Sequence, residues 1–145
     1  MCDVRTFPKA FQCYKPMTER VYGSICITPQ NKILLVHGRR SRKWSFPKGH
    51  KESGEAYLDC AIRETFEETG VNLRGVNPVS YQKLSVGEYY FFEIEEKSIL
   101  VNDISEVIEA RWMTIDEIRA VYSNVDVSNF LWRMKKSKTF FRSWE

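Results

Sequence analysis

The sequence predicts a single domain of the α/β class. Its 145 residues suffice for one domain with a substantial core, and 43% hydrophobic with 28% charged residues is an ordinary globular composition. Short strand-like runs alternate along the chain with segments of helical spacing. No apolar run approaches the roughly 20 residues of a membrane span. The chain begins without a signal-peptide core and has no Cys-x-x-Cys pair, so we expect a cytoplasmic protein with reduced thiols and no membrane partner.

The expected elements follow from local patterns, taken in chain order. Val21 to Thr28 predicts a strand that turns at Pro29-Gln-Asn-Lys32 into a second strand. Thr114-Ile-Asp-Glu117 is a capping-box sequence that opens a short helix. We expect strands at 21–28, 33–37, 81–86, 89–94 and 107–113, and helices at about 54–69, 114–122 and 126–137.

The expected helix at 54–69 has an acidic side. Glu64, Glu67 and Glu68 stand three and four residues apart, so they share one helix face. Three like charges cost stability, which makes sense if the face holds a hard cation such as Mg²⁺, because that ion takes oxygen ligands. The alternative is a solvated face with ordinary ion pairs, such as Arg63 with Glu67. The expected packed stripe is Leu58, Ile62, Thr65, Phe66 and Thr69.

The ends of this helix and its flanking residues follow a fixed spacing. Ser53 or Gly54 is the expected N-cap, and Gly70 is the expected stop. The order of glycine, five residues, glutamate, seven residues and Arg-Glu-Thr-Phe-Glu-Glu-Thr-Gly-Val closely resembles the signature of the Nudix hydrolases. Thr65 departs from it where the family usually has a bulky aliphatic residue, so we expect a small loss of packing. The matching positions are Gly49, Glu55, Arg63, Glu64, Glu67, Glu68, Gly70 and Val71.

The resemblance implies a fold and a reaction. The fold is an α/β/α sandwich with a mixed sheet between helices, as a single domain over 1–145 whose core spans about 18–122. The reaction is cleavage of a pyrophosphate bond in a nucleoside diphosphate linked to another group, with Mg²⁺ or Mn²⁺ as cofactor. The first 17 residues match nothing in this pattern.

The resemblance also assigns roles to residues of the motif. Glu64, Glu67 and Glu68 are the expected metal ligands and catalytic residues, and the Gly49 carbonyl is a backbone ligand. Arg63 is expected to form an ion pair with Glu55 that fixes the loop against the helix. Glu55 is also expected to reach a metal through water.

Glu106 is the expected general base outside the motif. Its position resembles that of the second catalytic glutamate of mRNA-decapping Nudix enzymes, which precedes a similar strand ending in tryptophan. Glu109 is the alternative base. A structural role for Glu106, as an exposed residue where a strand begins, is the other interpretation.

Several features bear on the substrate. Trp44-Ser-Phe-Pro-Lys-Gly49 looks like the corresponding segment of decapping enzymes, whereas Pro-Lys-Gly-His is what diadenosine tetraphosphate hydrolases carry. The basic, aromatic C-terminus favours RNA, although packing of the last helix explains its aromatics equally well. Those residues are Phe130, Trp132, Arg133, Lys135, Lys136, Lys138, Phe140, Phe141, Arg142 and Trp144. The expected substrate-binding residues are Lys48, Arg39, Arg40, Trp44, Tyr89 and Trp112, and exposed members of Tyr89, Tyr90 and Trp112 would stack on a methylated guanine.

Three functions therefore remain in competition. The favoured one is hydrolysis of the 5′ cap of mRNA, with capped RNA as partner. The second is the same chemistry on a small nucleoside polyphosphate such as diadenosine tetraphosphate, or on a diphosphoinositol polyphosphate whose charge suits Arg39 and Arg40. The third is a catalytically silent Nudix-fold binding protein, against which the complete glutamate set argues.

Overall fold

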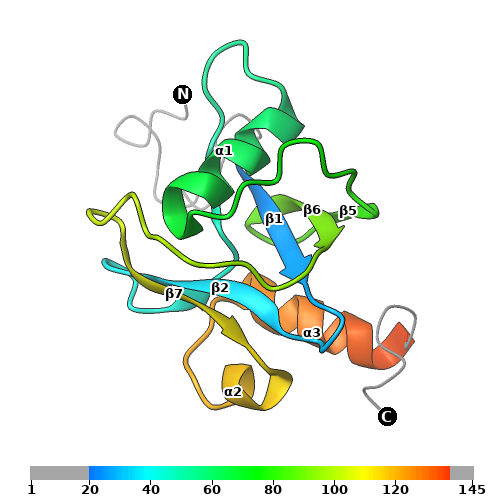
Figure 1. The fold of residues 1–145 in the computed structure, drawn as a ribbon. Coiled ribbons are helices and arrows are strands. Elements are labelled where there is room, and N and C mark those ends of the chain that lie inside the picture. Colours follow the sequence, from blue (N-terminus) through cyan, green and yellow to red (C-terminus); the bar gives the residue numbers. More distant parts are fainter. Residues whose placement is uncertain (1–19, 138–145) are drawn as a thin grey trace, which may run out of the picture.

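The structure, a computed structural model, describes residues 20–137 and consists of one mixed β-sheet with helices on both faces (Figure 1). The strands are β1 (Val21–Ile27), β2 (Ile33–Gly38), β3 (Trp44–Ser45), β4 (Lys48–His50), β5 (Ser80–Lys83), β6 (Gly87–Glu93) and β7 (Val107–Met113). The helices are α1 (Tyr57–Thr69), α2 (Ile115–Arg119) and α3 (Val125–Ser137). This arrangement confirms the predicted α/β/α sandwich.

Strand β1 lies at the centre of the sheet. It pairs in parallel with β6 and antiparallel with β2 and β4, while β2 also pairs with β3 and β7, and β5 pairs with β6. The parallel β1–β6 pair needs a crossover connection, and α1 lies within it. Tyr22 of β1 stands opposite Gly49 of β4 and Glu88 of β6, so β1 links the motif strand to the β5–β6 hairpin.

Two apolar clusters hold the helices against the sheet. Successive residues of a strand point to opposite faces, so neighbouring residues of β1 belong to different clusters. Cys26 packs with Ile62 of α1, and Ile25 packs on the other face with Phe130 of α3. Figure 1 shows the same arrangement, with α1 on one side of β1 and α3 on the other.

Helix α1 differs from its predicted form at three points. It begins at Tyr57, and Ala56 provides no side-chain cap, so neither Ser53 nor Gly54 caps it. Its C-terminus is as predicted, because Gly70 has φ 79° and its N–H donates to the carbonyl of Phe66. Phe66 itself is 48% exposed, at the edge of the packed stripe rather than in it.

Thr65 gives the third correction, because it forms a buried polar contact where we expected looser packing. Its hydroxyl is hydrogen-bonded to the hydroxyl of Ser24, and both residues are fully buried. A buried hydroxyl without a partner would cost free energy, so Ser24 on β1 makes Thr65 acceptable on α1. The departure from the family pattern is thus matched by a residue on the facing strand.

The second half of the chain follows its predicted elements except in the hairpin, where the strand predicted at 81–86 ends at Lys83 and the strand predicted at 89–94 begins at Gly87. Strand β7 has the predicted bounds, and Thr114 and Glu117 form both hydrogen bonds of the capping box. Helix α2 ends at Arg119, earlier than the expected Tyr122. Buried Asp126 of α3 ties that helix to the β5–β6 turn, because its carboxylate accepts from the N–H groups of Val86 and Gly87 and from the Tyr89 hydroxyl.

Some of the sequence-based expectations concern residues outside 20–137. Within the described range, no helix is long and apolar enough to cross a membrane. Cys26 and Cys60 are free and buried. The residues named above that lie outside the described range are Lys138, Phe140, Phe141, Arg142 and Trp144.

Candidate active site

The acidic face of α1 packs against the backbone of β4. The carboxyl group of Glu64 lies directly over Gly49, so a Cβ atom at this position would displace that carboxyl. One turn further along the helix, Glu68 accepts a hydrogen bond from the N–H of Lys48 at 3.2 Å. The motif glycine therefore allows the acidic face to approach β4 closely.

Arg63 joins the loop after β4 to the acidic face. Its guanidinium contacts Glu55 through two hydrogen bonds of 2.7 and 2.9 Å, which confirms the predicted ion pair. It also contacts Glu64 at 3.1 Å and Glu67 at 3.2 Å, and it donates to the carbonyl of His50. The hydrogen bonds from Arg63 lower the pKa of Glu55 to about 2.

Glu64 and Glu68 are buried carboxyl groups with strongly raised pKa values. They are 8% and 4% exposed. Loss of hydration raises the pKa of Glu64 to about 7, offset in part by Arg63, and Glu67 adds repulsion. Loss of hydration likewise raises the pKa of Glu68 to about 8, offset in part by Lys48. The solvated-face alternative is wrong for these two residues, because a positive partner is needed to keep both charged at neutral pH.

The donor set fits a hydrated divalent cation. Among residues 20–137, no group of three or more His, Cys, Asp or Glu side chains converges on one point. The contacts of Arg63 with Glu64 and Glu67 account for this, because they draw both carboxylates toward the guanidinium. Mg²⁺ keeps several waters and binds through one or two carboxylates, so the buried pair Glu64 and Glu68 beside a backbone carbonyl offers suitable oxygen ligands.

A cavity of about 500 Å³ opens beside the acidic face. The structure brings several of the predicted residues together there. Glu106 reaches the cavity from the segment before β7, where its carbonyl accepts from the N–H of Arg39 at 2.8 Å. Glu106 also raises the pKa of both Glu64 and Glu68 through repulsion. The predicted residues that line the cavity are Arg39, Arg40, Lys48, Gly49, Glu68 and Glu106.

The alternative base, Glu109, does not line this cavity. Its carboxylate is 2.7 Å from the guanidinium of Arg111, and in the sheet it stands opposite His37. The geometry therefore favours Glu106 over Glu109 as the residue that acts with the motif glutamates.

Three of the four aromatic residues expected to bind substrate have structural positions instead, and the fourth, Tyr90, does not line this cavity. Trp44 is buried, with His37 stacked on its ring at 4.8 Å and the Arg111 guanidinium 5.5 Å from its centre. Tyr89 is fully buried in the apolar cluster that contains Phe130 of α3. Trp112 packs against the apolar cluster that contains Ile62 of α1, and its indole N–H donates to the carbonyl of Lys97. We reassign all three to the packing of the sheet, because none lines the cavity.

The sequence reasoning missed a second cavity, which four tyrosines line. They come from β1, α1, β5 and β6, and only the two from β5 and β6 lie close together in the sequence. Each of the four lies on a different element, so no local pattern in the sequence relates them.

Replacing Glu68 with glutamine should remove a pH-dependent cost in the metal-free protein. Burial raises the pKa of Glu68 from its ordinary value of 4.5 to about 8, so folding is favoured most below pH 4.5, and this contribution to stability is lost as pH rises through about 8. We expect Glu68→Gln to leave the melting temperature nearly unchanged at pH 5 and to raise it by about 2 °C or more at pH 9, with a chelator present. Exposed Glu95→Gln serves as the control. Equal destabilisation at both pH values would contradict the assignment.

The comparisons with known proteins agree with this geometry. Residues 17–133 match the family model described as NUDIX domain. The chain is 32% identical over 95 residues to bis(5′-nucleosyl)-tetraphosphatase [asymmetrical] from Mus musculus, a match that covers 59% of this chain and 65% of that protein. It is 28% identical over 124 residues to mRNA-decapping enzyme subunit 2 from Arabidopsis thaliana, a match that covers 85% of this chain and 29% of that protein. The chain thus spans less than two thirds of the length of either relative.

A solved structure supports the fold. The crystal structure of a C. elegans Ap4A hydrolase binary complex is similar to this chain with a TM-score of 0.68 and 16% identity, covering 84% of this chain and 100% of that chain. At this identity the likeness concerns the fold alone. The family match covers most of the chain, including the glutamate face and Glu106. The chain belongs to the NUDIX domain family.

Proposed function

We propose that the protein is a metal-dependent pyrophosphohydrolase that cleaves the 5′ cap of RNA. The observation that carries the proposal is the composition of one cavity. Glu68 and Glu106 line it together with Lys48, Arg39 and Arg40. Acidic groups that bind a cation and activate water, beside cations that neutralise phosphate oxygens, are the requirements of pyrophosphate hydrolysis.

Mg²⁺ or Mn²⁺ is the cofactor in this proposal. Glu64, Glu67 and Glu68 would hold it with the carbonyl of Gly49, and Glu55 would contribute through a water. Bound there, it supplies positive charge to the phosphate oxygens and lowers the pKa of a bound water. Two buried carboxyls with raised pKa values support this role, because their ionised form needs a compensating cation.

The protein's own residues divide the remaining work. Lys48, Arg39 and Arg40 bind the phosphate chain and neutralise part of its charge. Glu106 accepts the proton of the water that attacks phosphorus, and the cleaved bond leaves its electrons on the departing phosphate oxygen. Arg63 is a positioning residue, because it ties Glu55 and the carbonyl of His50 to the acidic face.

Two observations favour capped RNA over a small molecule. The alignment with the Arabidopsis decapping subunit extends over 85% of this chain, against 59% for the mouse tetraphosphatase. The segment from Trp44 to Gly49 and the position of Glu106 also resemble those of decapping enzymes. The second candidate is a dinucleoside polyphosphate, favoured by Pro-Lys-Gly-His50 and by the similarity to the mouse tetraphosphatase. The cytoplasmic location and the diphosphoinositol alternative stay predictions.

A comparison of substrates in one assay tests the proposal. With Mg²⁺ or Mn²⁺ present, kcat/KM on a long capped RNA should exceed that on diadenosine tetraphosphate by about tenfold or more, a difference of about 1.4 kcal/mol. Glu67→Gln serves as the control, since loss of a ligand charge should abolish turnover on both. A preference for diadenosine tetraphosphate would select the second candidate. Absence of turnover on every substrate would select a silent binding protein.

Replacing Glu106 with glutamine should lower kcat by about 100-fold or more with little change in KM, because the side chain acts on water rather than on substrate binding. Glu109→Gln is the matched control and should retain nearly full kcat, since Glu109 does not line the cavity. Steady-state kinetics on the preferred substrate measures both. If Glu106→Gln changed only KM, Glu106 would be a binding residue, and the general base would be one of the glutamates of the motif.

A further inference from the structure

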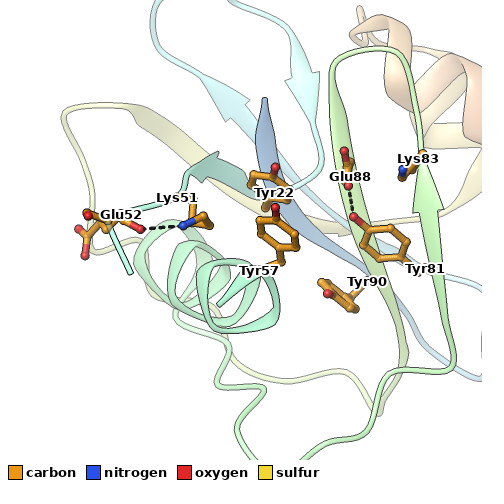
Figure 2. Close-up of a pocket in the computed structure, with 9 residues that line it drawn as sticks. Tyr22, Lys51, Glu52, Tyr57, Tyr81, Lys83, Glu88 and Tyr90 are labelled. Carbon is orange, nitrogen blue, oxygen red and sulfur yellow. Dashed lines mark hydrogen bonds between the residues drawn. The ribbon is translucent and has the colours of Figure 1, made fainter. Parts of the chain in front are cut away.

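A second cavity of about 620 Å³ lies next to the candidate active site (Figure 2). His50 lines the active-site cavity, and Lys51, the next residue, lines this one. We name it the tyrosine pocket, after the residues that dominate it. Its defining members are Tyr22, Tyr57, Tyr81, Tyr90, Lys51 and Lys83.

The aromatic rings of the tyrosine pocket form two pairs. Tyr22 and Tyr57 are stacked, with ring centres 4.7 Å apart and planes 7° from parallel. Tyr81 and Tyr90 form the second pair, with ring centres 4.8 Å apart. Tyr57 is 49% exposed and Tyr81 38% exposed, so each pair presents part of a ring to the cavity. A planar ligand can therefore extend either pair by stacking.

Cations stand beside both pairs of rings. The Lys51 ammonium is 5.9 Å from the centre of the Tyr57 ring, and it donates a hydrogen bond to the backbone carbonyl of Glu52. Lys83 is exposed, and within residues 20–137 its ammonium has no hydrogen-bond or ion-pair partner. Figure 2 shows the tyrosine rings between these two lysines.

The cavity also has two acidic residues, of which one is fully engaged. Buried Glu88 is 2.9 Å from the guanidinium of Arg20, and it also accepts a hydrogen bond from the Tyr81 hydroxyl. Glu52 lines the cavity too, and its largely exposed carboxylate lies 3.9 Å from the guanidinium of Arg63. The two lysines outnumber this one exposed carboxylate, which favours an anionic partner.

Flat aromatic surface with flanking cations matches the chemistry of single-stranded nucleic acid, in which planar bases alternate with phosphates. We propose that the tyrosine pocket binds a nucleotide of the RNA body, with its base stacked on Tyr57 or Tyr81 and a neighbouring phosphate on Lys51 or Lys83. The inference rests on the proposed function, since it assigns this nucleotide to the RNA that follows the cap.

The position of the tyrosine pocket connects it to catalysis. Tyr22 stands opposite Gly49 in the β1–β4 pair, and Tyr57 is the first residue of α1. Lys51 and Tyr57 both line the pocket, so a base bound there lies beside both ends of the loop that carries Glu55. A long substrate gains this contact and a cap dinucleotide does not, so the pocket favours long RNA.

Direct RNA binding by the full chain tests the inference. Fluorescence anisotropy of a labelled, uncapped, unstructured RNA is measured with a chelator present, so that no cleavage occurs. Tyr57→Leu, which keeps apolar bulk against Tyr22, should weaken binding about tenfold, as expected for one lost base–aromatic stack. Lys83→Glu should weaken binding and lower the slope of log Kd against log salt by about one unit. The matched controls are exposed Tyr122→Leu and Lys97→Glu, which should bind like the unsubstituted protein.

The outcomes separate the pocket from the proposed function. Unchanged RNA affinity and salt slope in both pocket variants overturn the inference, and a protein or small-molecule occupant would then explain the pocket. Weaker RNA binding in the variants, in a protein that cleaves no capped RNA, supports the pocket and refutes the proposed function. Normal cleavage of capped RNA with unaltered RNA binding in both variants supports the proposed function and refutes the pocket. Lys83→Glu changes an exposed position, so it keeps the test valid if Tyr57→Leu folds poorly.

Discussion

The burial of Glu64 and Glu68 against β4 is the constraint on which the rest of the site depends. Taking two carboxyl groups out of water side by side raises the pKa of each, to about 7 and about 8. The structure limits this cost with the Arg63 guanidinium on one group and the Lys48 N–H on the other. Gly49 leaves room for this packing, because the Glu64 carboxyl lies where a Cβ atom would otherwise be. Burying two carboxyl groups costs stability, and the metal site that we propose there accounts for that cost.

The sheet places this face between two different surfaces. Strand β1 pairs with the motif strand β4 on one side and with β6 on the other, so Tyr22 is in register with both Gly49 and Glu88. The active-site cavity lies next to Gly49, and the tyrosine pocket lies beyond Lys51. On the far face, α3 is anchored to the β5–β6 turn through Asp126. One substrate chain that entered both cavities would therefore be held by a single rigid unit.

Local sequence patterns predicted much of this arrangement and failed where tertiary contacts decided. The predictions of strand β7 and of the capping box of α2 were correct, because both rest on local signals. These are period-two alternation in β7 and the spacing of Thr114 and Glu117 in the capping box. The predicted start of α1 was wrong. No local cap is present, and the ion pair between Glu55 and Arg63, eight residues apart, holds the loop before the helix instead. Trp44 and Tyr89 were misassigned because composition does not reveal which strand face packs against α3. The tyrosine pocket was missed because its residues come from four separate elements and a loop.

The central claim is that the buried carboxyls of α1 hold a divalent cation, and proton release on metal binding tests it most directly. At pH 6.5 Glu64 and Glu68 are largely protonated, so a metal that binds them must displace protons. Calorimetric titration with Mn²⁺ in two buffers of different ionisation enthalpy measures the number of protons released. The account predicts release of about one proton or more at pH 6.5, falling toward zero by pH 9. Saturable binding without proton release at pH 6.5, or an absence of binding at either pH, would contradict it.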